Sequence, residues 1–265
     1  MSGAVVVLGA GLGSRLRPLT DDRPKCVVAV GGEPLAARML RQFHARGIHD
    51  ATVVVGHMAD RARELLSDAA SKLSGLRVRF VENKDYATTN TMYSTLLAMD
   101  ALAGGGYLVE GDIAASDEVI DRLIAADAKL SHWAADAWTS AHSGCRLTAN
   151  ATGRITAQEI FRARTAGPMP GMWKSAGMLK LSGDGAAALS RALSADAAAG
   201  RTNVYYDDVI GARMGDFDLR VLDLADAPWV EIDDLTDMAE ARRLFEQPNG
   251  GSASEAKVNE PGAAT

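Results

Sequence analysis

The chain has 265 residues, with 28 Lys and Arg against 34 Asp and Glu, which gives a formal net charge of −6. This acidic balance argues against a general nucleic-acid binder, because such proteins carry an excess of basic residues on one face. It does not exclude small anionic ligands, since a few local cations can outweigh a global charge. The hydrophobic content of 47% and the charged content of 23% are typical of a globular protein.

The sequence indicates a soluble, cytoplasmic protein. The first residues have no basic segment in front of a long apolar run, so we expect no secretory signal. No run approaches the roughly 18 apolar residues of a membrane span, and we expect no membrane partner. Cys26 and Cys145 are too few for a disulfide framework or a cysteine-rich metal site. The composition is compatible with an oligomer.

The first half of the chain alternates between strand patterns and helix patterns. Short apolar runs such as Ala4–Leu8 are typical of strands buried on both faces. Alternation of this kind predicts parallel strands joined by right-handed helical crossovers. The expected strands are Ala4–Leu8, Ala51–Val55, Arg77–Glu82 and Tyr107–Glu110, and the expected helices are Glu33–Arg46, Ala59–Leu73, Asn90–Ala103 and Asp117–Ala126.

After about Lys129 the apolar runs become shorter and more alternating, which favours a small antiparallel extension. We expect the segment Phe161–Lys174 to be either a substrate-facing flap or a plain surface loop. Residues 1–247 are predicted to form a single catalytic domain, and residues 248–265 a disordered tail, because the tail has almost no large apolar residue. The expected strands are Cys145–Thr148, Arg154–Thr156, Ala176–Leu181, Leu219–Leu222 and Trp229–Ile232, and the expected helices are Gly185–Ser194, Asn203–Met214 and Asp234–Phe245.

A glycine-rich turn, Gly9–Pro18, follows the first expected strand. Such a turn exposes backbone N–H groups to a phosphate. It is not a dinucleotide-binding loop, because the third glycine position is Ser14 and the second strand ends at Gly56 without an acidic residue. No Walker pattern follows either. Arg15 and Lys25 add two cations, and this combination suits a triphosphate better than a plain turn with surface charges.

Two acidic motifs, Glu110-Gly111-Asp112 and Glu231-Ile232-Asp233, each end an expected strand. Ligands gather at the carboxyl ends of parallel strands, so Asp112 and Asp233 could meet there and hold one Mg²⁺. The alternative is that Asp112 caps a helix near Ser116, and that Asp233 or Asp234 caps the last helix.

The loop Gly9–Pro18 with Pro24-Lys25 resembles the signature loop of the nucleotidyltransferases that activate sugar phosphates and phosphocholine. The resemblance implies a Rossmann-like, GT-A-like α/β fold with helices on both faces of a mostly parallel sheet. It also implies that Asp112 and Asp233 hold the metal, with Glu231 as a third ligand. Family members usually carry alanine at the position of Gly9, and we expect the glycine only to loosen the turn.

Within that family, the stretch Asn83–Ser94 is similar to the phosphocholine and phosphonate cytidylyltransferases. Its small polar groups can read the edge of a base, although Thr88, Thr89 or Asn90 can also cap a helix. Val204–Asp208 resembles the segment that receives the trimethylammonium group through aromatic faces and a carboxylate. The alternative is that this segment begins a helix with buried tyrosines. Arg162 and Arg164 depart from that branch and favour an acceptor with additional negative charge.

The sequence therefore predicts a Mg²⁺-dependent cytidylyltransferase that transfers CMP from CTP to a small phosphate or phosphonate and releases pyrophosphate. The alternatives are a sugar- or cyclitol-phosphate nucleotidyltransferase that uses UTP, dTTP or GTP, and an inactive nucleotide-binding regulatory module. The expected catalytic residues are Arg15, Lys25, Asp112 and Asp233; the expected nucleotide contacts are Leu8, Ala10, Gly11, Leu12, Gly13, Ser14, Arg15, Lys25, Gly56, Asn83, Thr89, Asn90, Ser94, Glu110 and Asp112; and the expected acceptor contacts are Arg162, Trp173, Tyr205, Tyr206 and Asp207.

Overall fold

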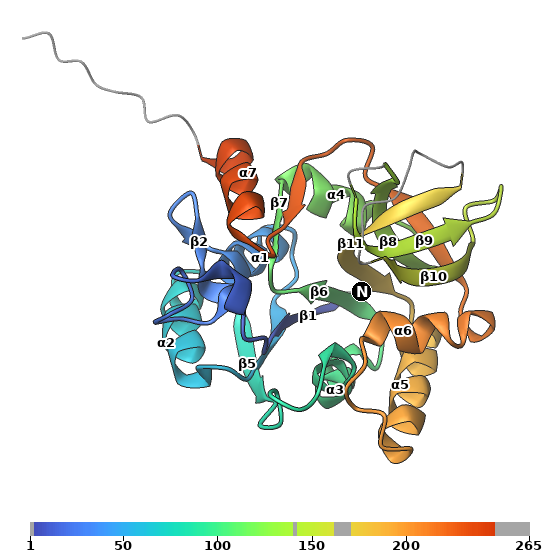
Figure 1. Ribbon diagram of the computed structural model, residues 1–265, viewed down its shortest axis with the longest axis horizontal. Helices are drawn as coiled ribbons and strands as arrows, with labels where there is room; N and C mark the ends of the chain where they lie inside the picture. The colour runs from blue at the N-terminus through green and yellow to red at the C-terminus, as the bar shows by residue number, and fades with distance from the viewer. Residues whose placement is uncertain (1–2, 140–141, 162–170, 247–265) are drawn as a thin grey trace, which may run out of the picture.

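The computed structural model describes residues 3–139, 142–161 and 171–246. Within these residues a nine-stranded mixed sheet forms the centre of the molecule, in the order β10-β9-β11-β6-β1-β4-β5, with β8 attached to β11 and β12 attached to β8 (Figure 1). The predicted fold class, a mostly parallel α/β sheet with an antiparallel extension, is confirmed.

The parallel half of the sheet is built from the four strands predicted in the first half of the chain. β1 pairs in parallel with β4 on one side and with β6 on the other, and β4 pairs in parallel with β5. All of β1 after its first residue is buried, as expected for a strand covered on both faces. The strands are β1 (Ala4–Gly9), β4 (Asp50–Val55), β5 (Arg77–Glu82) and β6 (Gly106–Glu110).

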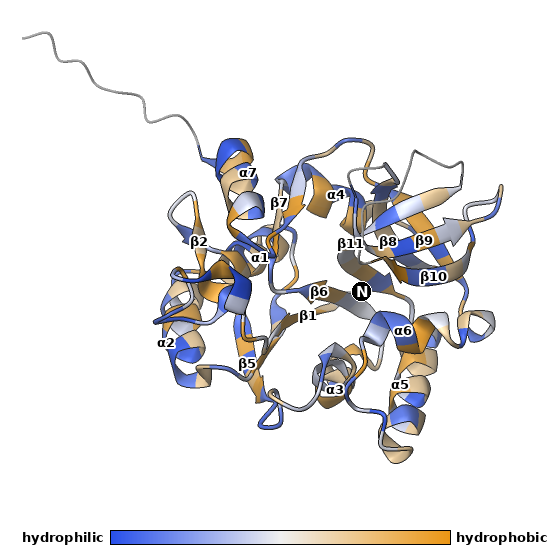
Figure 2. Cartoon of the chain, viewed as in Figure 1, coloured by the Kyte–Doolittle hydropathy of each residue, from blue (hydrophilic) through white to orange (hydrophobic). Residues whose placement is uncertain are grey.

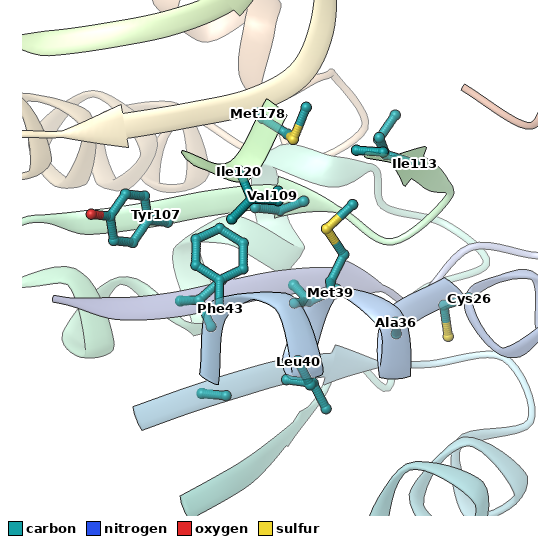
Figure 3. Packing of buried hydrophobic residues seen from close by; sticks show 14 of the residues in the cluster. Cys26, Ala36, Met39, Leu40, Phe43, Tyr107, Val109, Ile113, Ile120 and Met178 are labelled. Atoms are coloured by element: carbon teal, nitrogen blue, oxygen red, sulfur yellow. The ribbon is translucent and has the colours of Figure 1, made fainter. Parts of the chain in front are cut away.

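Helices cover both faces of these strands. One buried cluster joins Val5 and Val7 of β1 to α1, α2 and α4, and a second joins Val6 and Leu8 to α3, α5 and α6. Figure 3 shows the first cluster, where Phe43 and Met39 of α1 lie against Tyr107 and Val109 of β6. The helices are α1 (Leu35–His44), α2 (Ala59–Ser71), α3 (Thr91–Leu97), α4 (Asp117–Ala125), α5 (Gly183–Ala198) and α6 (Tyr206–Gly211).

The antiparallel extension begins at β11, which runs antiparallel to β6 and continues the sheet to β9 and β10. β8 was not predicted, because its sequence SHWAADA lacks a clear apolar alternation; its pairing with β11 and β12 buries it. The ends of the predicted loop Phe161–Lys174 belong to strands, and residues 162–170 lie outside the described part of the chain. The strands are β8 (Ser131–Ala137), β9 (Gly144–Ala149), β10 (Ile155–Phe161), β11 (Met172–Leu181) and β12 (Leu219–Asp223).

Three predicted helices are shorter or divided. The helix predicted over Asn90–Ala103 is α3 followed by a separate 3-10 helix, Met99–Leu102. The helix predicted over Asn203–Met214 is shortened to α6, because Tyr205 is extended and a separate 3-10 helix, Met214–Asp216, follows. The helix predicted from Glu33 begins at Leu35, because Glu33 and Pro34 pair with a preceding strand.

A small antiparallel ribbon lies outside the large sheet and corrects one prediction. β13 was expected to end like a strand of the parallel sheet, but it pairs with β7 instead. Helix α7 follows β13 and packs on a third buried cluster that includes Leu16, Ile232 and Met238. The elements here are β2 (Ala29–Val30), β3 (Glu33–Pro34), β7 (Ile113–Ala115), β13 (Trp229–Glu231) and α7 (Leu235–Phe245).

Hydropathy follows this arrangement. Hydrophobic residues lie along central strands such as β1, and the surrounding helices carry hydrophilic residues on their outer sides (Figure 2). Among the described residues, no helix has the length and apolar character needed to cross a bilayer.

Candidate active site

Lys25 lies where the two acidic motifs meet. Its Nζ donates to Oδ2 of Asp112 at 2.6 Å and to Oδ1 of Asp233 at 2.8 Å. The guanidinium of Arg15 forms an ion pair with the same Oδ1 of Asp233 at 3.0 Å. The four residues predicted as catalytic, Arg15, Lys25, Asp112 and Asp233, are therefore brought together from three distant parts of the chain.

These contacts fix the charge states of the cluster. Burial by itself lowers the pKa of Lys25, but the adjacent Asp112 and Asp233 carboxylates outweigh it, so the pKa of Lys25 is raised. Burial raises the pKa of Asp233, but the adjacent Lys25 and Arg15 cations lower it by more, so the pKa lies below its usual value. Near neutral pH Lys25 is therefore protonated and Asp233 is ionised.

Neither aspartate of the cluster serves as a helix cap. Ser116 caps α4, with its hydroxyl accepting from the amide of Val119. Asp234 caps α7 and forms a capping box with Asp237. Of the caps that the sequence left open, Asp234 is therefore the one that forms, and the metal role of Asp112 and Asp233 stays a prediction.

Backbone contacts hold the two motifs side by side. The amide of Ile232 donates to the carbonyl of Asp112 at 3.0 Å, and the amide of Asp233 donates to Asp237 at 2.8 Å. The amide of Gly111 donates to the carbonyl of Leu8 at 2.8 Å, and a Cβ at Gly111 would lie 2.5 Å from that oxygen. Only glycine permits this approach, which draws Asp112 toward the end of β1.

The glycine-rich turn leaves backbone donors open toward solvent. Within the described residues, the amides of Gly11, Leu12, Gly13 and Ser14 have no hydrogen-bond acceptor. Gly13 has φ +62° and leads into a 3-10 helix, Ser14–Leu16. A turn of this kind, beside Arg15 and Lys25, is suited to bind the oxygens of a polyphosphate.

The expectation that Gly9 only loosens this turn is wrong. A Cβ at Gly9 would lie 2.8 Å from Sγ of Cys26. The buried Cys26 thiol also donates to the carbonyl of Gly9 at 3.4 Å. The cysteine side chain fills the space that an alanine methyl group would need, so the two positions are coupled.

A cavity of about 130 Å³ lies beside Lys25 and the end of β6. Its lining includes ten of the residues predicted to contact a nucleotide. They are Leu8, Ala10, Gly11, Lys25, Asn83, Thr89, Asn90, Ser94, Glu110 and Asp112.

The other residues predicted to contact a nucleotide, Leu12, Gly13, Ser14, Arg15 and Gly56, are not part of this lining. Four of them lie along the glycine-rich turn and the 3-10 helix that follows it. Gly56 lies against the turn, since a Cβ there would lie 2.9 Å from the carbonyl oxygen of Ala10.

Asn83 organises one wall of this cavity. Its side-chain amide donates to the hydroxyls of Thr89 and Ser94, both at 3.0 Å, and its carbonyl oxygen accepts from the amide of Asp85. Asn90 caps α3 through its side-chain oxygen. Asn83 therefore positions other polar groups, while the side-chain nitrogen of Asn90 has no partner among the described residues.

A second cavity, of about 700 Å³, opens on the other side of the cluster. Its lining contains residues that the sequence analysis missed, above all Lys174, Trp229, His142 and Asp136. Alternation along β11 was the available signal: Trp173 and Lys174 are adjacent on a strand and so point to opposite faces. The lining is Arg15, Asp136, His142, Ser143, Gly144, Ile160, Phe161, Lys174, Trp229, Val230, Glu231, Asp233 and Asp237.

The described residues among those predicted to bind the acceptor, Trp173, Tyr205, Tyr206 and Asp207, do not line this second cavity. Trp173 packs against the core cluster that contains α5 and α6. Tyr206 is fully buried and donates its hydroxyl to Glu110 at 2.9 Å. Tyr205 is 38% exposed, Asp207 is buried, and Arg162 lies outside the described residues.

Three acidic groups near the cluster, Glu110, Asp207 and Glu231, have raised pKa values. Burial, with the nearby charge of Glu231, raises the pKa of Asp207 to about 7. Burial, with the charges of Asp207, Asp112 and Glu231, raises the pKa of Glu110 well above its usual value. Burial also raises the pKa of Glu231, although its ion pair with Lys174 acts in the other direction.

The residues present fit a divalent cation at Asp112 and Asp233. Oδ1 of Asp112 is buried and has no hydrogen-bond partner among the described residues, so it can accept a metal ion. Mg²⁺ commonly takes one or two carboxylates and completes its shell with waters and phosphate oxygens. Within the described part of the chain, no three His, Cys, Asp or Glu side chains form a metal-binding group, and Glu231 is held by Lys174 at 2.7 Å. Glu231 as a third ligand stays a prediction.

The fold and this constellation are those of a nucleotidyltransferase domain. The chain belongs to the MobA-like NTP transferase domain family, which matches residues 5–200. Its nucleotidyltransferase resemblance, inferred from Gly9–Pro18 and the acidic motifs, is thereby confirmed.

Curated relatives are similar to the chain in sequence. The CMP-5'-(3-aminopropyl)phosphonate synthase of Streptomyces rubellomurinus is 34% identical over 250 residues, which are 92% of this chain and 39% of that protein. The choline-phosphate cytidylyltransferase of Streptococcus pneumoniae is 34% identical over 107 residues, which are 40% of this chain and 43% of that protein. The chain thus spans about two fifths of the length of these relatives.

Solved structures share the fold. The CTP:phosphocholine cytidylyltransferase from Streptococcus pneumoniae has a TM-score of 0.75 at 22% identity, covering 93% of this chain and 100% of that one. The inositol-1-phosphate CTP transferase from T. maritima has a TM-score of 0.70 at 18% identity, covering 91% of this chain and 97% of that one.

Proposed function

We propose that this chain transfers CMP from CTP to a small phosphate or phosphonate acceptor and releases pyrophosphate. The observation that carries the proposal is the contact of Lys25 with both Asp112 and Asp233, directly beside the open amides of the glycine-rich turn. The relatives named for CMP-aminopropylphosphonate synthesis and for choline-phosphate cytidylyl transfer support the choice of cytidine and of this acceptor class.

In the proposed reaction, an acceptor oxygen attacks the α-phosphorus of CTP in line, and the bond from that phosphorus to pyrophosphate breaks. The attacking oxygen is already anionic near neutral pH, so no general base is required. The protein's contribution is positioning and charge neutralisation. Amides of Gly11–Ser14 and the guanidinium of Arg15 hold the triphosphate and receive the charge that passes to pyrophosphate.

We propose that Asp112 and Asp233 hold Mg²⁺ when the nucleotide binds. Such an ion lowers the charge repulsion between the two phosphorus-bearing reactants and orients them. With Mg²⁺ held by Asp112 and Asp233, the Lys25 ammonium would be available to contact the α-phosphate.

The cavity beside Asn83 is the proposed base site. The unpartnered side-chain nitrogen of Asn90 and the hydroxyl of Ser94 offer hydrogen bonds, and both residues line the cavity with backbone of the turn. Cytosine carries donors and acceptors on its edge that such groups can pair with.

The experiment is pyrophosphate release with Mg²⁺, a panel of CTP, UTP, dTTP and GTP, and a panel of small phosphates and phosphonates. We expect turnover with CTP. Turnover only with another nucleotide and a sugar or cyclitol phosphate would replace the proposal by its nearest alternative. Nucleotide binding without any turnover would indicate a regulatory module.

Two substitutions test the residue roles in the same assay. Lys25→Met should lower kcat about 10²-fold, the usual scale for the loss of one preorganised electrostatic group. Lys180→Met is the matched control, because Lys180 is also a lysine of low exposure but binds the carbonyls of Ile124 and Ala126 away from the site. Unchanged kcat in Lys25→Met would contradict the assigned role.

Asp112→Asn should abolish metal-dependent turnover, because an amide is a poor ligand for Mg²⁺ compared with a carboxylate. Asp117→Asn, on the exposed start of α4, serves as its control. Full activity of Asp112→Asn at all Mg²⁺ concentrations would show that the metal binds elsewhere.

A further inference from the structure

The second cavity, of about 700 Å³, contains a lysine to which the proposed chemistry assigns no role. The side chain of Lys174 is only 9% exposed, and its Nζ forms an ion pair with Oε2 of Glu231 at 2.7 Å. The same Nζ lies 6.0 Å from the ring centre of Trp229. A carboxylate together with an aromatic face is the pair of partners that proteins offer to a bound organic cation. Here the chain's own ammonium occupies both.

The backbone makes room for this lysine. Gly144 lines the same cavity with φ +90°, and a Cβ there would lie 3.0 Å from Nζ of Lys174. Any larger residue at this position would have to displace the ammonium. The glycine therefore leaves the space that the Lys174 ammonium occupies.

Lys174 also keeps unused hydrogen-bonding capacity. A lysine ammonium has three donors, and Glu231 is the only acceptor found for it among the described residues. The carboxylates around the cavity, by contrast, already have donors. Asp136 accepts from Trp229, Asp233 accepts from Lys25, and Asp237 accepts from two backbone amides. Each of these carboxylates thus already has a donor, while Lys174 keeps donors for an incoming tail.

The lysine lies at a suitable distance from the proposed reaction centre. Glu231, which holds it, precedes Asp233 by two residues, a step of about 6–7 Å where the chain is extended. An acceptor whose phosphorus group lies at Asp112 and Asp233 would extend a short aliphatic tail toward Lys174. The group at the end of that tail would meet an ammonium.

We propose that Lys174 determines acceptor specificity: it excludes a tail that ends in an ammonium, above all a trimethylammonium, and selects one that ends in a hydroxyl or carboxylate. This inference rests on the proposed cytidylyltransferase function. A cationic tail would meet a like charge in a place shielded from water, and Trp229 and Glu231 are already engaged. An oxygen at the end of the tail accepts a hydrogen bond from the unused donors of Lys174.

The test is the acceptor preference of the wild-type chain and of Lys174→Met. With CTP and Mg²⁺, kcat/KM is measured for 2-hydroxyethylphosphonate, 3-phosphonopropionate, 2-aminoethylphosphonate and phosphocholine. We expect the wild-type chain to prefer the better oxygen-ended acceptor over phosphocholine by about tenfold or more, because like charges brought together suppress the wrong partner. Lys174→Met should reduce that ratio by about tenfold while the KM for CTP stays unchanged.

Two further variants keep the outcome interpretable. Lys180→Met, on the same strand but outside this cavity, should leave the ratio as in the wild type. If Lys174→Met fails to fold because Glu231 is left unpaired, Lys174→Met/Glu231→Gln removes both charges together and should show the same change in preference.

The outcomes separate this inference from the function beneath it. A wild-type preference for either ammonium-ended acceptor, or a ratio that Lys174→Met leaves unchanged, would overturn the role of Lys174 alone. No pyrophosphate with any acceptor and any nucleotide would overturn the proposed function and the inference with it.

Discussion

Lys25 shows how one side chain can define a site. Its ammonium joins two carboxylates that are 87 and 208 residues away along the chain. Without it, Asp112 and Asp233 would bring two like charges together in a half-buried place, at a cost in folding free energy. In the proposed function the same ammonium contacts a substrate phosphate, so the stability of the unliganded site and the proposed chemistry would depend on one residue.

Gly9 and Cys26 give a prediction about packing at the start of the turn. Gly9→Ala should destabilise the fold by about 1–3 kcal/mol, because the new methyl group meets Sγ of Cys26 and overpacks a filled core. Adding Cys26→Ala should recover most of that loss, and a double-mutant cycle from denaturant unfolding measures the coupling. Gly11→Ala is the control, since nothing lies within 4 Å of a Cβ there. Additive effects of the two substitutions would refute the coupling.

Asp207 predicts a pH dependence of stability. Burial and Glu231 raise its pKa to about 7, and its Oδ1 has no partner among the described residues. Because the folded pKa is above the ordinary value near 4, the stability due to the protonated carboxyl is present at low pH and is lost as pH rises through about 7.

Asp207→Asn should therefore raise Tm relative to the wild type more at pH 8 than at pH 5. Thermal unfolding at the two pH values measures the difference. Asp208→Asn, at the next position of α6 and less buried, is the matched control. A Tm difference independent of pH would show that Asp207 does not titrate in this range.

At the scale of elements, the ribbon of β7 and β13 and the start of α7 decide where the second carboxylate lies. β13 lies outside the large sheet and pairs with β7. It places Asp233 directly before Asp234, the N-cap of α7. Asp237 in the first turn accepts from the amides of Asp233 and Asp234. The helix terminus thus holds the backbone of a residue in the site.

Asp234→Ala should lower stability by about 1 kcal/mol, the usual cost of losing an N-cap. For a chain of this size that corresponds to a fall in Tm of about 2–4 °C. We also expect a severalfold loss of kcat in the pyrophosphate assay, because the segment that carries Asp233 loses its anchor.

Ser116→Ala removes the corresponding cap from α4, which begins five residues after Asp112. It should lower Tm by a similar amount and leave kcat unchanged. Equal effects of both cap variants on kcat would mean that α7 does not position the site.

At the scale of the whole molecule, the site lies at the carboxyl ends of β1 and β6, between the two core clusters and beside the third. The family match over residues 5–200 covers the parallel sheet and most of the extension, but ends before β13 and Asp233. The C-terminal β13 and α7 complete the constellation from outside the matched range. Both segments therefore belong to the domain that we propose for residues 1–247.

Removing residues 248–265 should leave Tm and CTP binding unchanged, because this stretch has almost no large apolar residue that could add to the core. The measurements are thermal unfolding and a CTP titration of the truncated chain. Truncation after residue 234, which also removes α7, is the comparison and should unfold the protein or abolish binding. A loss of CTP binding in the shorter deletion would assign the tail a role in the site.

The sequence by itself determined what depends on local patterns. Apolar runs identified β1, β4 and β6, alternation identified β5, and spacing identified most helices, because periodicity reports burial directly. Glycines and a cation within the turn indicated a polyphosphate site, and two acidic motifs indicated the carboxylates.

Only the tertiary structure decided what depends on distant partners. It showed that Asp234 and Ser116 are the caps, that Cys26 fills the space at Gly9, and that Tyr206 is buried in the core. It also showed that Lys174, and not the predicted neighbour Trp173, lines the second cavity. The physical reason is the same in each case: the side chain's surroundings come from strands and loops far away in the sequence, so no local pattern records them.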